Sequence, residues 1–152
     1  MHTIARRHLV LLCACLATGA WAADPARGTR DEAKAMAEAA AAHVGSVGAE
    51  QAAKDFAGDK WHQKDLYVFM MDMDANMLFH GANAKLVGKN FAEVRDSSGK
   101  EFNKEMITTA KKGSGWVDYQ WAHPVSKKVE DKTAYIIKTK KLEGFVGVGV
   151  YR

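Results

Sequence analysis

Tyr119 and Trp121 are two residues whose types and spacing can bind a small polar molecule. They lie two positions apart in the predicted strand 116–122, and residues two apart in a β-strand face the same side. The phenol offers a hydrogen-bond donor, and the indole offers one N–H group beside a flat apolar surface. Together they can line a pocket for a carboxylate, which needs donors inside an apolar enclosure. The other interpretation is that both rings only pack in the core.

Two lysines could supply the charge for such a pocket. Lys138 shares a strand face with apolar residues of the predicted strand 133–140. A buried ammonium group without a partner is costly, so an inward-facing Lys138 predicts a bound anion. Alternatively, Lys138 lies near the strand end and extends to water. Lys132 is a similar candidate, although we expect it in a loop, where lysines are usually solvated.

His80, Tyr67 and Phe69 are further ligand-binding candidates in two predicted strands, 66–71 and 77–80. His80 alternates with an apolar residue and so is expected to face inward, where its ring can donate to a carboxylate or hold a structural hydrogen bond. Tyr67 and Phe69 share one face of their strand. One face of this strand must meet a helix and the other the pocket, and the pattern leaves open which is which.

The remaining polar patterns predict no metal site, no cofactor and no enzymatic activity. Asp72, Asp74 and Asn76 resemble the start of a calcium loop, but the glycine and distal glutamate of an EF-hand are missing, which favours a turn. The histidines have no zinc-ligand spacing. No glycine-rich phosphate loop precedes a helix, and no Ser-His-Asp arrangement can be assigned.

Residues 1–23 have the pattern of a secretory signal peptide. Arg6 and Arg7 precede the apolar run 9–16, and Ala20-Trp21-Ala22 is a small-x-small cleavage signal. We therefore expect cleavage near Ala22 or Ala23 and a periplasmic or secreted protein. The apolar run is shorter than the roughly 20 residues that span a bilayer, and no later segment is long and apolar enough, so the mature chain is not expected to cross a membrane.

The remaining residues, 24–152, fit a single domain, because the whole chain has only 152 residues. Loss of Arg6 and Arg7 leaves 20 basic and 18 acidic residues, a net charge of +2. Such a small and dispersed excess argues against nucleic-acid binding. Cys13 and Cys15 are also lost, which excludes disulfides, thiol catalysis and thiolate metal sites.

The secondary-structure pattern is that of an α+β protein. A capping box, Thr29 to Glu32, opens a helix with an alanine-rich apolar stripe. A second short helix, a hairpin and a further helix behind a capping box at 98–101 follow. The chain ends with three strands at 116–122, 133–140 and 145–151, joined by short connections that favour antiparallel neighbours.

The motifs together resemble the single Cache family of bacterial extracytoplasmic sensor domains, over about residues 33–151. The resemblance is carried by DLYVFMMDMDANMLFHGANAKLVGKNF, DSSGKEF, GSGWVDYQWAHP, KTAYIIK and GFVGVGVY. It implies a PAS-like fold, with a five-stranded antiparallel sheet, a long N-terminal helix on one face and a small-molecule pocket on the other. One departure is the turn 74–76, which lacks the usual glycine, although Asn76 can adopt the left-handed conformation.

The resemblance implies a non-enzymatic, chemotaxis-related sensor for a small organic anion, such as pyruvate, acetate or propionate. Members usually belong to chemoreceptors and histidine kinases, whereas this sequence shows no signalling module and looks like a stand-alone exported form. Its output would then need a partner, such as a membrane receptor or transporter. The alternative is a protein–protein interaction module of the cell envelope whose pocket is filled by its own side chains.

Overall fold

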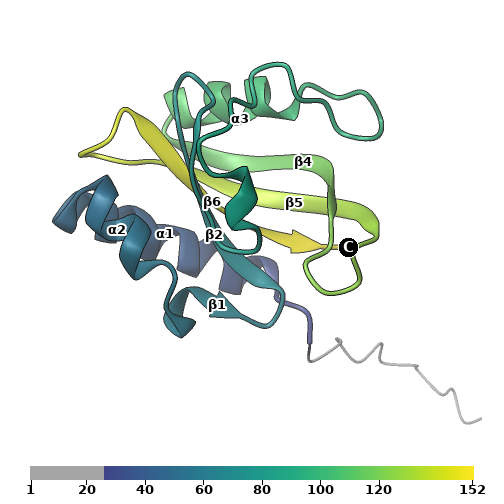
Figure 1. Ribbon diagram of the computed structural model, residues 1–152, viewed down its shortest axis with the longest axis horizontal. Coiled ribbons are helices and arrows are strands. Elements are labelled where there is room, and N and C mark those ends of the chain that lie inside the picture. Colours follow the sequence, from purple (N-terminus) through teal and green to yellow (C-terminus); the bar gives the residue numbers. More distant parts are fainter. Residues whose placement is uncertain (1–25) are drawn as a thin grey trace, which may run out of the picture.

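The computed structural model describes residues 26–152 (Figure 1). The predicted signal peptide, 1–23, lies outside the described residues, as do the first two residues of the predicted domain 24–152. Among residues 26–152, no helix combines the length and the apolar character that a bilayer span requires.

The fold is α+β, as predicted, with an antiparallel sheet between helices. The helices are α1 (Arg30–Val47), α2 (Ala49–Asp55) and α3 (Phe102–Lys111), with short 3-10 turns η1 (Asp59–Trp61) and η2 (Ala84–Leu86). The strands are β1 (His62–Gln63), β2 (Leu66–Asp72), β3 (Met77–His80), β4 (Ser114–Ala122), β5 (Val129–Lys138) and β6 (Gly144–Tyr151). Their order is β1-β2-β6-β5-β4, and β3 pairs with β2 outside this path. The short β1 makes six strands where five were expected.

The N-terminal helix α1 lies along one face of the sheet, on the side opposite to α3 (Figure 1). The predicted capping box is confirmed: the Thr29 hydroxyl accepts the Glu32 N–H at 3.2 Å, and the Glu32 carboxylate accepts the Thr29 N–H at 2.8 Å. The buried stripe of α1 is rich in alanine, which lets the helix approach the sheet closely. Its members are Ala33, Met36, Ala37, Ala40 and Val44.

The two faces of the sheet bury two separate clusters, which answers the question that the pattern of β2 left open. The helix face packs on α1 and includes Leu66, Val68 and Met70 of β2. The opposite face, here called the pocket face, includes Tyr67, Phe69 and Met71, and is covered by α3 and the segment 81–101. The predicted candidates Tyr67 and Phe69 therefore face away from α1.

An irregularity in the hairpin brings His80 to the pocket face. The register between β2 and β3 shifts between Met70 and Met71. As a result Leu78 and Phe79 both pack toward the helix face, while Met77 and His80 are buried at the cavity on the other side. The inward orientation of His80 was predicted, but simple alternation is not its cause.

Three local expectations are corrected. The predicted box at 98–101 does not cap α3, because the Ser98 hydroxyl donates to Asp96 instead, and Glu101 caps α3 without a side-chain bond. In the turn after β2, Ala75 and not Asn76 adopts the left-handed conformation, with φ 65°. β5 begins at Val129 rather than at residue 133, because its pairing with β4 continues to the strand end.

Gly147 is required where β6 crosses beside β2. A Cβ atom at this position would lie 2.2 Å from the Phe69 ring, closer than any real contact. We expect Gly147→Ala to lower the free energy of unfolding by about 1–3 kcal/mol through overpacking. Gly45→Ala is the matched control, because Gly45 lies inside α1 and an added Cβ would make only an ordinary contact, 3.9 Å from the Lys140 Cβ. It should raise stability by about 0.5–1 kcal/mol. Urea unfolding of both variants measures the difference, and equal effects would contradict the packing argument.

Candidate ligand-binding site

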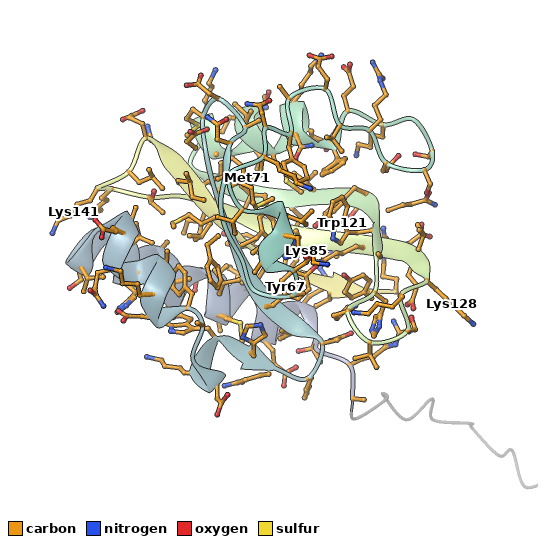
Figure 2. All side chains as sticks on the ribbon, in the orientation of Figure 1. Tyr67, Met71, Lys85, Trp121, Lys128 and Lys141 are labelled. Atoms are coloured by element: carbon orange, nitrogen blue, oxygen red, sulfur yellow. The ribbon has the colours of Figure 1, made fainter. Side chains whose placement is uncertain are left out.

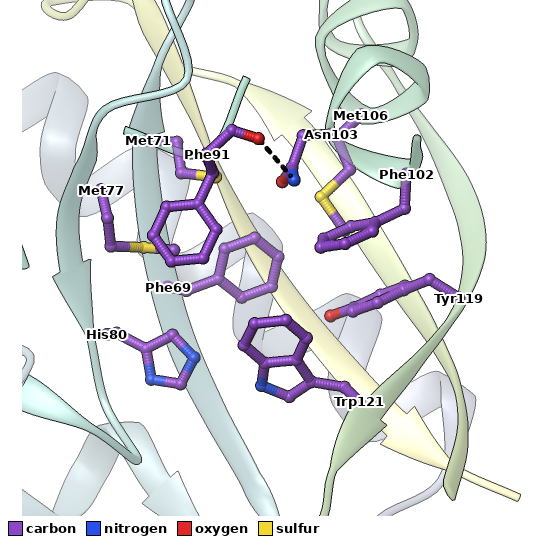
Figure 3. Close-up of a pocket in the computed structure, with 10 residues that line it drawn as sticks. All are labelled: Phe69, Met71, Met77, His80, Phe91, Phe102, Asn103, Met106, Tyr119 and Trp121. Carbon is purple, nitrogen blue, oxygen red and sulfur yellow. Dashed lines mark hydrogen bonds between the residues drawn. The ribbon is translucent and has the colours of Figure 1, made fainter. Parts of the chain in front are cut away.

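A small cavity lies between the pocket face and its cover (Figure 3). Its volume is about 20 Å³, which is room for about one water molecule. The wall consists of aromatic rings, three methionines, one histidine and one asparagine. These residues are Phe69, Met71, Met77, His80, Phe91, Phe102, Asn103, Met106, Tyr119 and Trp121.

Tyr119 and Trp121 belong to the core and to the cavity wall at once. The Tyr119 ring stacks on Phe102 with 4.8 Å between centroids, and Trp121 meets the same Phe102 edge-on at 5.7 Å. Neither the Tyr119 hydroxyl nor the Trp121 Nε1 has a hydrogen-bond partner among residues 26–152. Figure 3 shows both rings facing the cavity. The two interpretations of this pair are therefore compatible, since the rings pack while their donors stay free.

His80 supplies a third free donor to the same space. Its Nδ1 accepts the backbone N–H of Asn83 at 3.1 Å, which places the ring proton on Nε2. Burial, together with the charge of Lys132, lowers the pKa of His80 to about 3, so the ring is neutral at physiological pH. No acceptor of the described residues meets Nε2, and the ring lies 6.3 Å from that of Trp121. A carboxylate at this position would find three donors around it.

Lys132 is the one lysine of the described chain that is wholly buried, with 0% of its surface exposed. Its Nζ donates to the Tyr67 hydroxyl at 2.7 Å and to the Tyr151 hydroxyl at 3.4 Å. The same Nζ lies 4.0 Å from the centroid of the Tyr67 ring. Burial lowers the pKa of the Lys132 ammonium to about 7, against the opposing effect of the Asp65 charge. Within residues 26–152, no carboxylate forms an ion pair with this amine.

The strand neighbours of Lys132 make room for its side chain. Lys132 stands between Tyr119 of β4 and Tyr151 of β6 in the sheet. A Cβ atom at position 149 would lie 2.3 Å from the Lys132 Cε, so Gly149 is what allows the lysine to lie flat across β6. Tyr151 in turn donates to the Ala122 carbonyl at 2.9 Å, which fixes its hydroxyl as an acceptor for the lysine.

A buried acid lies behind this cluster without contacting the lysine. Asp65 accepts the backbone N–H of Gly28 at 2.6 Å through Oδ1, and its Oδ2 lies 3.5 Å from the His123 Nε2. The His123 ring meets Tyr151 edge-on at 4.7 Å. Asp65 therefore favours the charged form of Lys132 at a distance, and the amine keeps only neutral partners among the described residues.

The expectation for Lys138 is corrected. Lys138 is exposed at the last position of β5, and it borders a surface groove beside α1. The alternative orientation, toward water, is the one found. Lys132, expected in a loop, lies within β5 and is buried, because the β4–β5 pairing includes Tyr119 opposite Lys132.

The structure brings together all the other predicted residues. His80, Phe69, Tyr119 and Trp121 line the cavity, and Tyr67 lies beside Lys132. Their part in binding a ligand stays a prediction. Sequence reasoning missed Tyr151, Asp65 and His123 as parts of the site. The glycines that alternate with Tyr151 along the last strand were a usable signal, because they leave space for large side chains of the neighbouring strand.

A second and larger space adjoins the first. This cleft has a volume of about 400 Å³ and lies between the segment 80–86 and the β4–β5 connection. His80 and Trp121 line both the cavity and the cleft, and Tyr67 lines the cleft. Two side chains therefore form the partition between the cavity and the cleft.

A sheet with a long N-terminal helix on one face and a small pocket on the other defines the class of PAS-like sensor domains. The sequence profile of the family Single Cache domain 2 matches residues 26–152. The chain therefore belongs to this family, as the motifs predicted.

Relatives of the chain are sensory proteins. It is 34% identical over 88 residues to the sensor histidine kinase MctS of Rhizobium johnstonii, and 32% identical over 91 residues to the methyl-accepting chemotaxis protein McpP of Pseudomonas putida. These matches cover 58% and 59% of this chain but only 19% and 17% of the relatives. The chain thus spans less than a fifth of the length of the curated relatives it matches.

Solved structures with the same fold are also sensory. A methyl-accepting chemotaxis protein of Vibrio parahaemolyticus superposes with a TM-score of 0.70 at 21% identity, over 80% of this chain and 86% of that one. A Cache chemosensory domain, described as a structural basis for carboxylic acid recognition, superposes with a TM-score of 0.68 at 25% identity, over 80% and 91%. The PAS-like fold predicted from the motifs is confirmed.

The pKa of Lys132 has a consequence for stability. Because burial lowers it from 10.5 to about 7, the unfolded chain binds more protons between these pH values, and stability rises with pH there. We expect the difference in unfolding free energy between wild type and Lys132→Met to change by about 1.4 kcal/mol per pH unit from pH 7 to 10, in favour of wild type. Below pH 7 it should be flat.

Urea unfolding of both proteins at a series of pH values measures this difference. Lys138→Met is the matched control, because Lys138 lies on the same strand but is exposed. Its difference from wild type should not change between pH 7 and 10. A flat curve for Lys132→Met as well would mean that the Lys132 amine is solvated.

Proposed function

We propose that this chain is a sensor domain that binds a small organic anion of the short carboxylate class, such as pyruvate, acetate or propionate, and that it catalyses no reaction. The observation that carries the proposal is the buried amine of Lys132, which has only neutral hydrogen-bond partners among residues 26–152. A bound carboxylate would be the missing counter-charge.

The energetics favour an anion at this place. An ammonium group in an apolar interior is costly unless it is paired and hydrogen-bonded. Tyr67 and Tyr151 satisfy two of its three protons but bring no negative charge. A carboxylate near Lys132 would supply that charge and accept from the free donors of Tyr119, Trp121 and His80. The same groups would repel a cation.

The ligand must create part of its own space. The cavity of about 20 Å³ is too small for an acid of a few carbons, so His80 and Trp121, which divide it from the cleft, must move apart. The three methionines of the wall can adapt as well, because their side chains are unbranched and have three rotatable bonds. We therefore place the carboxylate between the cavity and the cleft, next to Lys132.

The relatives support a sensory role. They include a histidine kinase and a chemotaxis receptor, and a Cache domain of 25% identity is described as recognising carboxylic acids. We infer a periplasmic or secreted location, with export by the signal peptide 1–23. Signal output would then pass to a membrane receptor or transporter. Nucleic acid is not a partner in this proposal, since the mature charge is small and dispersed.

One observation favours the second candidate, an interaction module of the cell envelope without a small ligand. The cavity is almost filled by the protein's own side chains. In that case the buried lysine would be a neutral structural group, hydrogen-bonded to Tyr67, and no acid would change the stability of the domain.

A thermal-shift series separates the two candidates. At about 100 times its Kd, a ligand that binds only the folded state adds about 2.7 kcal/mol. We therefore expect acetate, propionate or pyruvate to raise the Tm by about 5–10 °C. Lys132→Met should abolish the increase, and Lys138→Met should keep it. No increase with any of the three acids would favour the interaction module.

Binding should also be coupled to proton uptake. At pH 8 the lysine is largely neutral in the free protein, because its pKa is about 7, while the acid is ionised. A carboxylate beside it raises that pKa, so the complex takes up nearly one proton at pH 8 and almost none at pH 6. The Kd for propionate should then increase by up to tenfold per pH unit above 7.

Titration calorimetry in two buffers with different heats of ionisation gives the number of protons. Uptake near zero at pH 8, with binding intact, would show that the ligand's carboxylate does not meet the lysine. Lys138→Met is again the control and should leave the uptake unchanged.

A further inference from the structure

We propose that the cleft beside Lys132 is a second anion subsite, and that the preferred ligand is therefore a short dicarboxylate. The inference rests on the proposed function, since it assigns the first carboxylate to Lys132 and the second to Lys85 and Lys127 in the cleft. The two lysines of the cleft narrow the proposed ligand class from short carboxylates in general to short dicarboxylates.

The charged residues that line the cleft are all basic. Lys85 and Lys127 line it and are exposed, so both ammonium groups can reach a ligand there. No aspartate or glutamate of the described residues lines this space. Its two histidines, His80 and His123, use Nδ1 as an acceptor for backbone N–H groups. The cleft thus presents cations and neutral groups to a solute.

The two lysines come from segments far apart in sequence. Lys85 lies in η2, where its backbone N–H donates to the Asn83 side chain at 3.1 Å. Lys127 lies in the β4–β5 connection, where its backbone N–H donates to the His123 carbonyl at 3.0 Å. Its Nζ donates to the Pro124 carbonyl. Figure 2 labels Lys85 near Trp121 and Tyr67, and all three residues line the cleft.

The cleft also lies close to the buried cation, although Lys132 itself does not line it. Tyr67 lines it and is bonded to the Lys132 Nζ at 2.7 Å, while His80 and Trp121 separate it from the inner cavity. A volume of about 400 Å³ lies within the range of about 300–1,000 Å³ found for small-molecule sites. An acid seated beside Lys132 therefore points its other end into a space that holds two further cations.

Two unbranched, saturated acids, propionate and succinate, test this subsite. Propionate and succinate differ by one added carboxylate group, and both are fully ionised at neutral pH. We expect succinate to bind the whole protein about tenfold more tightly than propionate at low ionic strength, because two exposed lysines each contribute a modest attraction. The preference should weaken as salt is added.

The variant Lys85→Gln/Lys127→Gln should lose the preference, so that succinate binds about as weakly as propionate while propionate affinity changes less than twofold. The control is Lys111→Gln/Lys112→Gln, which removes the same charge from exposed positions at the end of α3. It should keep the tenfold preference. Calorimetric titration with each acid gives all the Kd values.

Each outcome is decisive. Equal affinity for the two acids in wild type, or a preference that survives in Lys85→Gln/Lys127→Gln, overturns the second subsite but leaves the proposed function intact. Binding of neither acid overturns both. Loss of the preference in the cleft variant alone supports the dicarboxylate assignment.

Discussion

The burial of one ammonium group among phenols is the constraint on which the rest of this structure depends. Lys132 has no exposed surface, and its Nζ is held by Tyr67 and Tyr151, whose hydroxyls are acceptors without charge. Such a group destabilises an empty apolar interior. Its presence accounts for Gly149, which leaves room for the lysine stem, and for the hydroxyls that meet it from β2 and β6. A core built for stability alone would use an aliphatic side chain here.

The two sheet faces differ in composition and in role, and this difference follows from the constraint. The helix face is a conventional hydrophobic core that stabilises the fold. Aliphatic residues of β2 and β6 pack there on the alanine-rich stripe of α1. The pocket face holds the rings, the methionines and the polar groups, and its cover comes from α3 and an irregular segment. The shifted register of the β2–β3 hairpin then turns His80 toward the cavity. A stable face thus supports a face that contains unsatisfied donors and a little free space.

Much of this was predictable from the sequence, and the misses have a physical cause. Capping chemistry, apolar periodicity and motif resemblance predicted the helix α1, the main strands and the Cache fold, since these depend on local patterns. The pattern placed Lys138 inside the strand and Lys132 in a loop, whereas both lie in β5. Which of the two is buried depends on where the cover of the sheet ends, and that is a property of tertiary structure. The convergence of Lys132, Tyr67 and Tyr151 comes from three separate strands, so no single pattern contains it.

Polar groups near the lysine hold both ends of the described chain. Tyr151, one residue before the end of the sequence, bonds the Lys132 Nζ on one side and the Ala122 carbonyl on the other. Asp65, whose charge acts on the pKa of Lys132, holds the backbone N–H of Gly28, two residues before α1 begins. The surroundings of the lysine therefore include residues that hold both ends of the domain. This contiguity is what coupling between the site and the chain ends requires physically, and it involves a small number of polar groups.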